Sequence, residues 1–449
     1  MRSTTDAELI DAVRFAARPL SGADDDDYDA LLKLIGDAHF VLLGEASHGT
    51  HEFYRERARI TRRLIAERGF NAVAIEGDWP DAYRVNRFVR GLGHDALAVD
   101  ALAGFQRFPT WMWRNTDVVE FIDWQRAFNG AKSAQARTGF YGLDLYSLNR
   151  SMEAVLRYLE KADPLAARRA RERYACFDRF GEDSQIYGLM VGNGAAKACE
   201  EEVIAMLVDL RRRAAAVAHS GSAADEEEAF NAEQNARLVK NAEAYYRSMY
   251  LSDVSSWNLR DRHMVETLGA LERHLWRHGV SPKIVVWAHN SHLGDARATE
   301  MGQRRGELNV GQLVREQHGR DAVLVGFTTH WGSVTAASDW GAPAERKQVM
   351  PSRADSYEGV MHATGLGRFM LPLRDAGPHT ATLLEPRLER AIGVIYRPDT
   401  ERQSHYFFAQ LGEQFDALIH VDETRAVEPL DRNAEWNDAE APETYPTGL

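Results

Sequence analysis

Carboxylate and histidine side chains recur in this sequence directly after short apolar segments. Glu45 and His48 lie in the segment GEASHG, which follows one such segment, and Glu76 follows the next one along the chain. A neutral imidazole can take a proton from water, and a neighbouring carboxylate can orient the ring and stabilise its cation. Residues of the same kinds follow three further apolar segments, namely Asp144, His289, His292 and His330. This set suits a hydrolase, and three such side chains with a water could equally hold a zinc ion.

The apolar segments themselves predict buried strands. Phe40–Leu43 and Ala72–Ile75 are apolar throughout, and the stretch between them, His51–Arg68, has helical periodicity and ends before Gly69. Continuous apolar strands joined through a helix indicate a parallel sheet that is covered on both faces. Further strands are predicted at residues 139–143, 284–287, 323–327, 392–396 and 417–419. Because ligands bind outside the carboxyl ends of parallel strands, we expect the carboxylates and histidines to converge on one catalytic cleft.

Arg57 falls on the apolar face of the helix predicted at residues 51–68. Phe53, Ile60 and Leu64 are spaced to lie on the same stripe of that helix. A guanidinium on an inward face needs an anionic partner, because an unpaired buried charge is very costly. We expect this partner to be one of the nearby glutamates, Glu45 or Glu76. The alternative is that the arginine extends its charged end to the surface.

The chain between residues 150 and 275 differs from the rest. It is rich in Ala, Arg and Glu and shows few strand signals, so we predict a helical insertion or cap. The α/β core, a parallel-rich central sheet flanked by helices, is then predicted at residues 1–149 and 276–430. Residues 431–449 are predicted to form a poorly packed acidic tail.

Composition and charge exclude several classes of protein. The chain has 449 residues, of which 44% are hydrophobic and 27% charged, as in an ordinary globular protein. No segment approaches the about 18 to 20 apolar residues that a membrane helix needs. The formal net charge is −13 and no basic stripe is visible, so neither nucleic acid nor a membrane is an expected partner. The motifs of serine hydrolases, P-loop and dinucleotide enzymes and H-E-x-x-H zinc enzymes are absent.

Two features bear on the cellular compartment. The first twenty residues carry acidic groups and lack the apolar core of a signal peptide. The chain has only two cysteines, Cys176 and Cys199, and so sparse a pair does not indicate a disulfide scaffold or a zinc finger. We therefore predict a cytoplasmic protein in a reducing compartment, with both cysteines as core residues.

Several long segments closely resemble the erythromycin esterase family, and the matches run from about residue 42 to residue 430. These segments are LLGEASHGTHEFYRERARITRRLIAERGFNAVAIEGDWP, WNLRDRHM, VVWAHNSHLGD and ERAIGVIYRPDTERQSHYFFAQLGEQFDALIHVDETRAVEPL. The G-E-x-x-H-G and H-N-x-H-x-G segments, in this order and separation, are quite specific. The resemblance implies a parallel-rich α/β sheet with a helical lobe over the cleft, and hydrolysis of the lactone ester of large-ring macrolides.

The resemblance also implies roles for individual residues. His48 resembles the family's general base, which activates a water, and Glu45 resembles the carboxylate that works beside it. Arg57 falls where the family has its active-site arginine. The other matched positions are a second acidic site residue and the paired histidines of the opposite wall, namely Glu76, His289 and His292.

We therefore predict a hydrolase that cleaves a carboxylic ester, such as a macrolide lactone, by His-activated attack of water, with no metal and no cofactor. Asp144 and His330 are predicted to bind the small-molecule substrate. Arg260 and Asp261, in the segment NLRDRHM, are expected to form an ion pair within the helical lobe. Two alternatives stay open: a metal-dependent hydrolase with the same His and Glu cluster, and a non-catalytic protein that binds haem or another small ligand.

Overall fold

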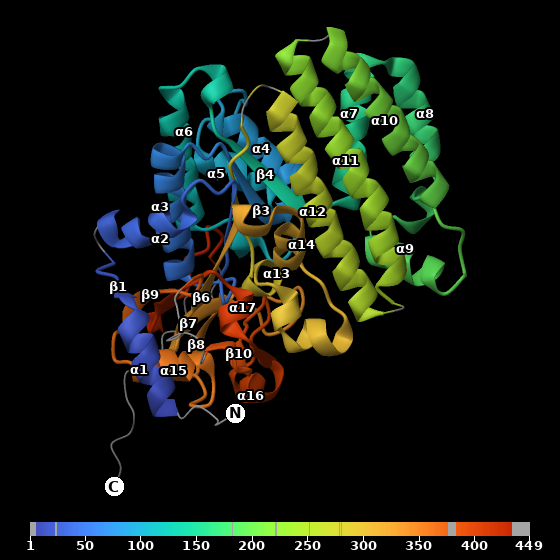
Figure 1. Cartoon of the computed structure of the whole chain (residues 1–449). Coiled ribbons are helices and arrows are strands. Elements are labelled where there is room, and N and C mark those ends of the chain that lie inside the picture. The colour runs from blue at the N-terminus through green and yellow to red at the C-terminus, as the bar shows by residue number, and fades with distance from the viewer. Residues whose placement is uncertain are drawn as a thin grey trace. The chain divides into compact units, whose positions relative to one another are not determined.

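The chain folds into two compact units, each built from separate parts of the sequence. The first unit comprises residues 1–71, 89–138 and 283–449, and the second comprises residues 72–88 and 139–282. The computed structural model (Figure 1) describes residues 6–22, 25–181, 183–220, 222–250, 252–277, 279, 281–375 and 383–432. The predicted acidic tail lies outside the described residues beyond Arg432.

The first unit contains a mixed, mostly parallel sheet. Its strand order is β1-β9-β12-β6-β2-β5, and the last four of these strands are parallel to one another. Strands β9 and β1 are added antiparallel at one edge. The bounds are β1 Arg18–Pro19, β9 Arg368–Pro372, β12 Ala417–Val421, β6 Ala322–Thr328, β2 Phe40–Leu43 and β5 Ile284–Trp287. The strands predicted at residues 40–43, 284–287, 323–327 and 417–419 are thus present, and every residue of β2, β5, β6 and β12 is buried.

Helix α3, His51–Arg68, follows β2 over the range that its periodicity predicts. It ends at Gly69, whose φ of 70° is a left-handed conformation that glycine adopts without steric cost. Trp287 Nε1 of β5 donates a hydrogen bond to Thr61 Oγ1 of α3 at 2.9 Å, which fixes the helix against the sheet. The other helices of this unit are α1 Asp6–Ala16, α2 Asp29–Ile35, α5 Ala98–Ala101, α6 Thr116–Gly130, α13 Asn290–Leu293, α14 Val310–His318, α15 Tyr357–Ala363, α16 Glu401–Ser404 and α17 Leu411–Gln414.

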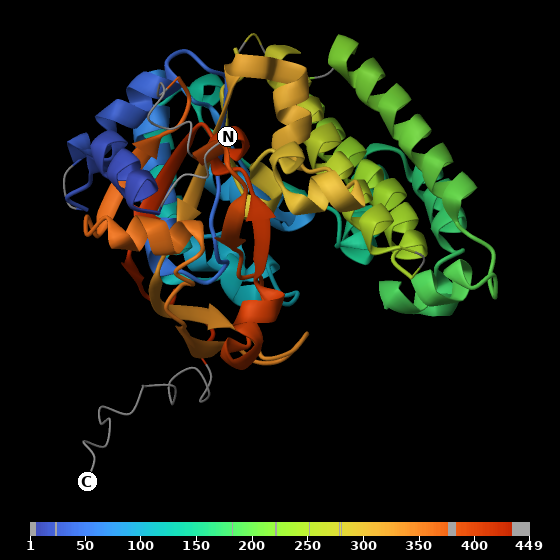
Figure 2. The ribbon, with the colours of Figure 1, turned by 60° about the horizontal axis from the view of Figure 1, so that its bottom comes forward.

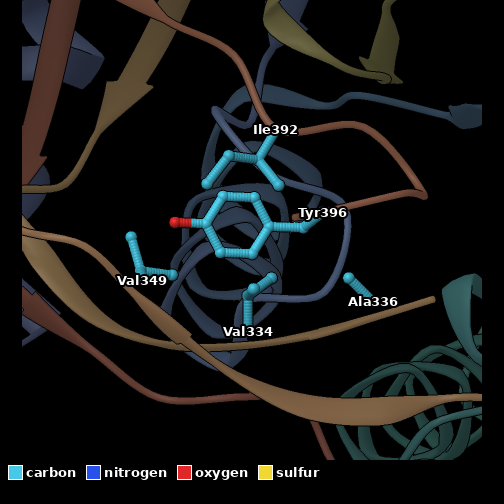
Figure 3. Close-up of a cluster of buried hydrophobic side chains, with 5 residues drawn as sticks. All are labelled: Val334, Ala336, Val349, Ile392 and Tyr396. Carbon is cyan, nitrogen blue, oxygen red and sulfur yellow. The ribbon is translucent and has the colours of Figure 1, made fainter. Parts of the chain in front are cut away.

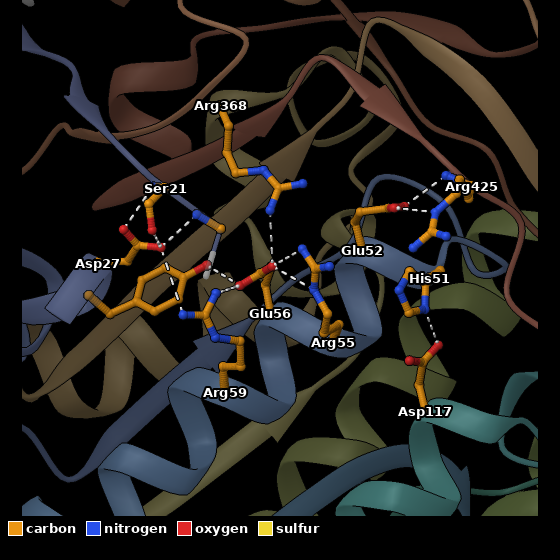
Figure 4. A network of polar contacts seen from close by, with 12 residues as sticks. Ser21, Asp27, His51, Glu52, Arg55, Glu56, Arg59, Asp117, Arg368 and Arg425 are labelled. Atoms are coloured by element: carbon orange, nitrogen blue, oxygen red, sulfur yellow. Dashed lines mark hydrogen bonds and ion pairs between the residues drawn. The ribbon is translucent and has the colours of Figure 1, made fainter. Parts of the chain in front are cut away.

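The other face of α3 is held by a network of ion pairs (Figure 4). Glu56 is 1% exposed and accepts hydrogen bonds from Tyr28 Oη at 2.7 Å, Arg55 Nε at 2.9 Å and Arg59 Nη1 at 2.9 Å. Asp27 Oδ1 accepts a hydrogen bond from the backbone N–H of Ser21 at 2.8 Å, and Asp27 Oδ2 lies 3.7 Å from Arg59 Nη2. Because each carboxylate is met by several donors, this network anchors the N-terminal segment to α3.

A smaller sheet and the segment at residues 392–396 share an apolar cluster (Figure 3). Strands β7 Trp331–Ala336, β8 Glu345–Val349 and β13 Glu423–Thr424 form this sheet in the order β13-β7-β8. The strand predicted at residues 392–396 is wrong, because Ile392 and Ile395 make only isolated bridges, to Ser47 and Ala337. The apolar pattern there reflects side-chain burial in the cluster of Val334, Ala336, Val349, Ile392 and Tyr396. The sequence also did not predict the antiparallel pair of β10 Arg387–Arg390 and β11 Tyr406–Ala409.

The second unit combines one parallel strand pair with long helices. Strands β3 Ala72–Asp78 and β4 Gly139–Asp144 pair in parallel, as predicted from their apolar runs. The helices are α4 Trp79–Val89, α7 Leu148–Ala162, α8 Pro164–Tyr174, α9 Ser184–Gly192, α10 Glu200–Ser220, α11 Ala223–Ser248 and α12 Asp253–Arg277. Helices α10 and α11 lie side by side in both views (Figures 1 and 2). The helical character predicted for residues 150–275 is therefore present in this unit.

The two cysteines form a disulfide, which corrects the expectation drawn from their scarcity. Cys176 and Cys199 are bonded, with Cα atoms 5.9 Å apart. Among the described residues, no helix is both long and apolar enough to cross a membrane.

Candidate active site

Glu45 and His48 lie in the loop that follows β2, where the backbone passes very close to its neighbours. A Cβ atom on Gly44 would lie 2.1 Å from Asn290 Oδ1, and one on Gly49 would lie 1.8 Å from the carbonyl oxygen of Thr335. No residue with a side chain fits at either position. The two glycines of the GEASHG segment therefore bring this loop against the rest of the first unit.

A buried chain of three charged or polar side chains runs through this loop to α3. His48 Nδ1 lies 3.0 Å from Glu45 Oε1, and Arg57 Nη2 donates to Glu45 Oε2 at 2.6 Å. Glu45 is 1% exposed and Arg57 is fully buried, with its guanidinium 4.6 Å from the ring centre of Tyr54 and 5.2 Å from that of Trp287. Arg57 thus stays inside, paired with one of its two expected partners and stabilised by cation–π contacts.

Glu45 determines which nitrogen of His48 can act as a base. A carboxylate only accepts hydrogen bonds, so the contact with Glu45 places the ring hydrogen of His48 on Nδ1. The other nitrogen, Nε2, then carries a lone pair. Tyr54 Oη donates to the backbone carbonyl of His48 at 2.7 Å and holds the residue in place. His48 is therefore oriented from both its ring and its backbone.

His289 lies next to His48 at the carboxyl end of β5. The two ring centroids are 4.8 Å apart, and the ring planes are tilted by 49°. His289 caps α13: its Nδ1 accepts the backbone N–H of Ser291 at 3.2 Å and lies 2.8 Å from Ser291 Oγ. Because Nδ1 is an acceptor here, the ring hydrogen of neutral His289 is on Nε2. His48 and His289 therefore present opposite tautomers, one suited to accept a proton at Nε2 and one suited to donate a hydrogen bond from it.

Asn290 joins the two segments that carry these histidines. Its backbone N–H donates to the carbonyl oxygen of Glu45 at 2.8 Å, and its side-chain Nδ2 donates to Phe327 O of β6 at 2.7 Å. His292, on α13, is 2% exposed, and its backbone N–H donates to the carbonyl of His289 at 2.9 Å. Sequence reasoning missed Asn290 and Tyr54, although the spacing of Tyr54 on α3 next to Arg57 could have indicated an inward position.

His330 follows β6 but belongs to a different group of side chains. Its Nδ1 lies 2.7 Å from Ser352 Oγ, and its ring stacks on His362 with centroids 3.7 Å apart. His362 in turn lies 2.9 Å from Asp422 Oδ1, which follows β12. Burial, together with the neighbouring His362, lowers the pKa of His330 to about 4. His330 is therefore a neutral ring at neutral pH.

Glu76 and Asp144 come together in the second unit, around an arginine that sequence reasoning assigned to another role. Arg260 Nη2 of α12 lies 2.7 Å from Glu76 Oε1 and 2.7 Å from Asp144 Oδ2, and its Nε donates to Asp144 Oδ1 at 2.9 Å. Burial opposes the charge of Arg260, but Asp144, Tyr146 and Glu76 raise its pKa well above the ordinary value. Arg260 is thus paired with two strand carboxylates, which need a buried cation of this kind.

The metal-dependent alternative requires a group of side chains that could ligate a metal ion. In the part of the chain that the structure describes, no group of three or more His, Cys, Asp or Glu side chains is arranged to hold a metal ion. In the loop after β2, the oxygens of Glu45 are instead directed to His48 and Arg57. This geometry leaves Nε2 of His48 suited to accept a proton and Nε2 of His289 suited to donate a hydrogen bond.

Comparison with known proteins places this geometry in a family. The model of the erythromycin esterase family matches residues 65–424, most of the chain. The chain is similar to erythromycin esterase type II of Escherichia coli, with 23% identity over 424 residues that cover 90% of this chain and 94% of that protein.

Solved structures share the same mixed α/β fold. A succinoglycan biosynthesis protein is similar with a TM-score of 0.75 at 21% identity, covering 94% of this chain and 98% of that one. A histidine-to-asparagine variant of the erythromycin esterase EreC, in its open conformation, is similar with a TM-score of 0.64 at 19% identity, covering 91% of this chain and 96% of that one. With the family model matched over most of its length, the chain belongs to the erythromycin esterase family.

Proposed function

We propose that this protein hydrolyses a carboxylic ester, with a macrolide-type lactone as the substrate class, by direct addition of water. The observation that carries the proposal is the buried chain from Arg57 through Glu45 to His48, next to the ring of His289. Membership of the erythromycin esterase family supports ester hydrolysis in general. The similarity to the Escherichia coli erythromycin esterase supports the macrolide class in particular.

In the proposed reaction, Nε2 of His48 takes a proton from a water as the water oxygen adds to the ester carbonyl carbon. Glu45, hydrogen-bonded to Nδ1, stabilises the imidazolium that forms, and Arg57 fixes the carboxylate of Glu45. A general base of this kind contributes about 10² to 10⁴ in rate. When the carbon–oxygen bond to the alcohol breaks, His48 returns its proton to the departing oxygen. The products are a carboxylic acid and an alcohol, which in a lactone belong to one opened molecule.

His289 is proposed to stabilise the negative charge that develops on the carbonyl oxygen. Its Nε2–H is a donor because Ser291 occupies Nδ1, and its ring lies 4.8 Å from that of His48. A preorganised donor of this kind acts most strongly on the transition state, where the charge is largest. His292 is proposed to support the same step or the departure of the alcohol oxygen.

The remaining predicted site residues are proposed to act less directly. Glu76 is proposed to contribute to turnover, while Asp144 and His330 are proposed to contribute to substrate binding. Each role has a distinct kinetic signature, because a residue that acts in the transition state changes kcat and one that binds substrate uniformly changes KM.

The proposal is tested by mass spectrometry of macrolides and simpler lactones incubated with the purified protein. We expect at least one compound to gain a single water, and the His48→Ala variant to lose nearly all of this activity. The matched control is His39→Ala, which removes a histidine just before the amino end of β2, paired with Asp321. If no lactone or ester gains water, the proposal of ester hydrolysis fails. If His48→Ala converts the substrate at the wild-type rate, the assignment of the base is wrong.

A further inference from the structure

Two carboxyl groups, those of Glu358 and Glu389, are buried in the first unit. Glu358 of α15 and Glu389 of β10 are each 1% exposed, and Gln414 of α17 is equally buried. Neither carboxylate oxygen of Glu389 has a hydrogen-bond partner among the described residues, nor has Glu358 Oε2 or Gln414 Oε1. Buried polar atoms are normally paired, so a cluster of unpaired oxygens requires an explanation.

Burial raises the pKa of Glu358 and the charge of Arg390 opposes this rise, whereas no arginine is among the groups that shift the pKa of Glu389. Glu358 Oε1 accepts the backbone N–H of Arg390 at 2.9 Å, which places it beside β10. The guanidinium of Arg390 is instead paired with Glu401 at 2.9 Å, and that of Arg387 is paired with Asp6 at 2.5 Å. The titratable and charged groups around the pair of Glu389 and Glu358 are Tyr357 on α15, Arg387 and Arg390 on β10, Glu401 on α16 and Tyr406 on β11.

A proton on Glu389 explains the unpaired oxygens. Two carboxylates can only accept hydrogen bonds, whereas a protonated carboxyl group can donate one to a neighbouring oxygen. Burial and the charge of Glu358 raise the pKa of Glu389 to about 8, and the nearby side chain of Gln414 acts in the opposite direction. Glu389 is therefore neutral at neutral pH and becomes charged at mildly alkaline pH.

The same cluster is tied to both segments of the candidate active site. Three residues after Glu389, the N–H of Ile392 donates to the carbonyl of Ala46 at 2.8 Å, within the loop that carries His48. The carbonyl of Gln414 accepts the N–H of Asp295 at 3.0 Å, just after the segment that carries His289. A Cβ atom on Gly294 would lie 2.8 Å from Gln414 Nε2, so the side chain of Gln414 packs directly against the backbone of Gly294.

We propose that Glu389, kept neutral between Glu358 and Gln414, is a positioning residue for the site formed by His48 and His289. The catalytic role of that site rests on the proposed function, whereas the buried proton and its link to the two segments do not. When Glu389 ionises, an uncompensated charge appears against Gln414 and Glu358. The charge repels Glu358 and loosens the contacts that hold residues 44–50 and 289–295.

The buried proton is tested by thermal unfolding of the full chain across the pH range. The pKa of Glu389 is about 8 in the folded protein and 4.5 as a model value, so the folded state binds the proton more tightly. The contribution of this proton to the free energy of unfolding is full below pH 4.5 and is lost as the pH rises to about 8. The Tm of Glu389→Gln, whose amide mimics the neutral carboxyl group, should therefore rise relative to wild type over that interval and keep a constant difference above it.

Two further variants make this test decisive. Glu413→Gln removes an exposed carboxylate next to Gln414 and should follow the wild-type Tm at every pH. Glu358→Gln removes the neighbouring charge and should move the transition of Glu389 to lower pH. A constant Tm difference between wild type and Glu389→Gln overturns the proposal. Stabilisation of wild type, but not of Glu389→Gln, by calcium chloride would show a bound cation in place of the proton and would also overturn it.

The positioning role is tested by hydrogen–deuterium exchange at about pH 9, above the transition of Glu389. Residues 44–50 and 289–295 should exchange faster in wild type and Glu413→Gln than in Glu389→Gln, and equal rates overturn the positioning role. Once an ester substrate is identified, kcat of wild type should fall as the pH rises, with an apparent pKa near 8. This fall should be absent from Glu389→Gln. If no ester is hydrolysed, the proposed function fails, while the exchange experiment still decides the positioning role.

Discussion

Two groups of histidines in the first unit follow the carboxyl ends of strands in one parallel sheet, yet their surroundings differ. His48, after β2, lies 3.0 Å from Glu45, whose side chain is 1% exposed and is paired with the fully buried Arg57. His330, after β6, bonds Ser352 and stacks on His362, whose side chain is 49% exposed.

The comparison shows that a position at a strand end does not by itself define a chemical role. A carboxylate that is buried and fixed by an arginine can stabilise the imidazolium that forms when His48 takes a proton. His330 has no such carboxylate on its own ring, and its neighbour His362 disfavours a second positive charge. We therefore propose general-base chemistry for His48 and substrate binding for His330.

The largest expected effect comes from breaking the buried pair behind His48. Arg57→Met leaves the carboxylate of Glu45 buried without a counter-charge, which costs about 3 to 5 kcal/mol of unfolding free energy. Urea denaturation measures this loss. The double variant Arg57→Met with Glu45→Gln should recover most of it, because no unpaired charge then remains. As a matched control, Arg14→Met removes an exposed pair with Asp11 and should cost about 0 to 1 kcal/mol. A small loss in Arg57→Met would show that Glu45 does not depend on this arginine.

The next effect comes from removing the proposed donor beside His48. His289→Ala should lower kcat by about 10² to 10³, equivalent to about 2.7 to 4 kcal/mol of transition-state stabilisation. Because the donor acts mainly on the developing oxyanion, KM should change little. Steady-state kinetics on the ester found in the lactone screen provide the measurement. A rise in KM with unchanged kcat would move His289 to a binding role, like that proposed for His330.

A smaller effect is expected in the second unit. Glu76→Gln removes one carboxylate from Arg260, which keeps two hydrogen bonds to Asp144. The fold should therefore tolerate the change, and kcat should fall by roughly tenfold, about 1.4 kcal/mol. Kinetics and thermal unfolding of the same preparation separate the two effects. An unchanged kcat would restrict Glu76 to a structural role beside Arg260.

The smallest effect concerns the charge state of His330. The pKa of this ring is about 4 in the folded protein and 6.5 as a model value, so the unfolded state binds the proton more tightly. The contribution of the neutral His330 ring to the free energy of unfolding is full above pH 6.5 and is lost as the pH falls towards about 4. Because the ring is partly exposed and solvent screens it, we expect about 1 kcal/mol or less. His330→Gln should show a weaker loss in urea denaturation at acid pH than wild type. An identical loss in both proteins would contradict the lowered pKa.

The sequence predicted the elements whose residues are buried on every side. Strand β2 and helix α3 were found at their observed bounds, because continuous apolar residues and helical periodicity are strong signals. The segment at residues 392–396 shows the limit of this reasoning, because its apolar side chains fill a cluster while its backbone forms only isolated bridges. Strands such as β8, Glu345–Val349, were missed because most of their residues are only half-buried.

The ion-pair and disulfide partners of individual side chains were the hardest feature to predict from the sequence, because they depend on tertiary contacts. Arg57 was recognised because it interrupts an apolar face, whereas Arg260 gave no such signal on a helix rich in charges. The disulfide between Cys176 and Cys199 was also missed, since the chain between them had to fold before their distance was known. The neutral state of Glu389 likewise depends on burial and on Glu358, neither of which is visible in the order of residues.

The most direct test of the central claim compares kcat for His48→Ala and His330→Ala on the same ester at saturating concentration. If the Arg57–Glu45–His48 chain makes His48 the base, kcat should fall by about 10² to 10⁴ in His48→Ala. In His330→Ala, kcat should stay within about twofold of wild type while KM rises. Equal values of kcat in the two variants would contradict the account.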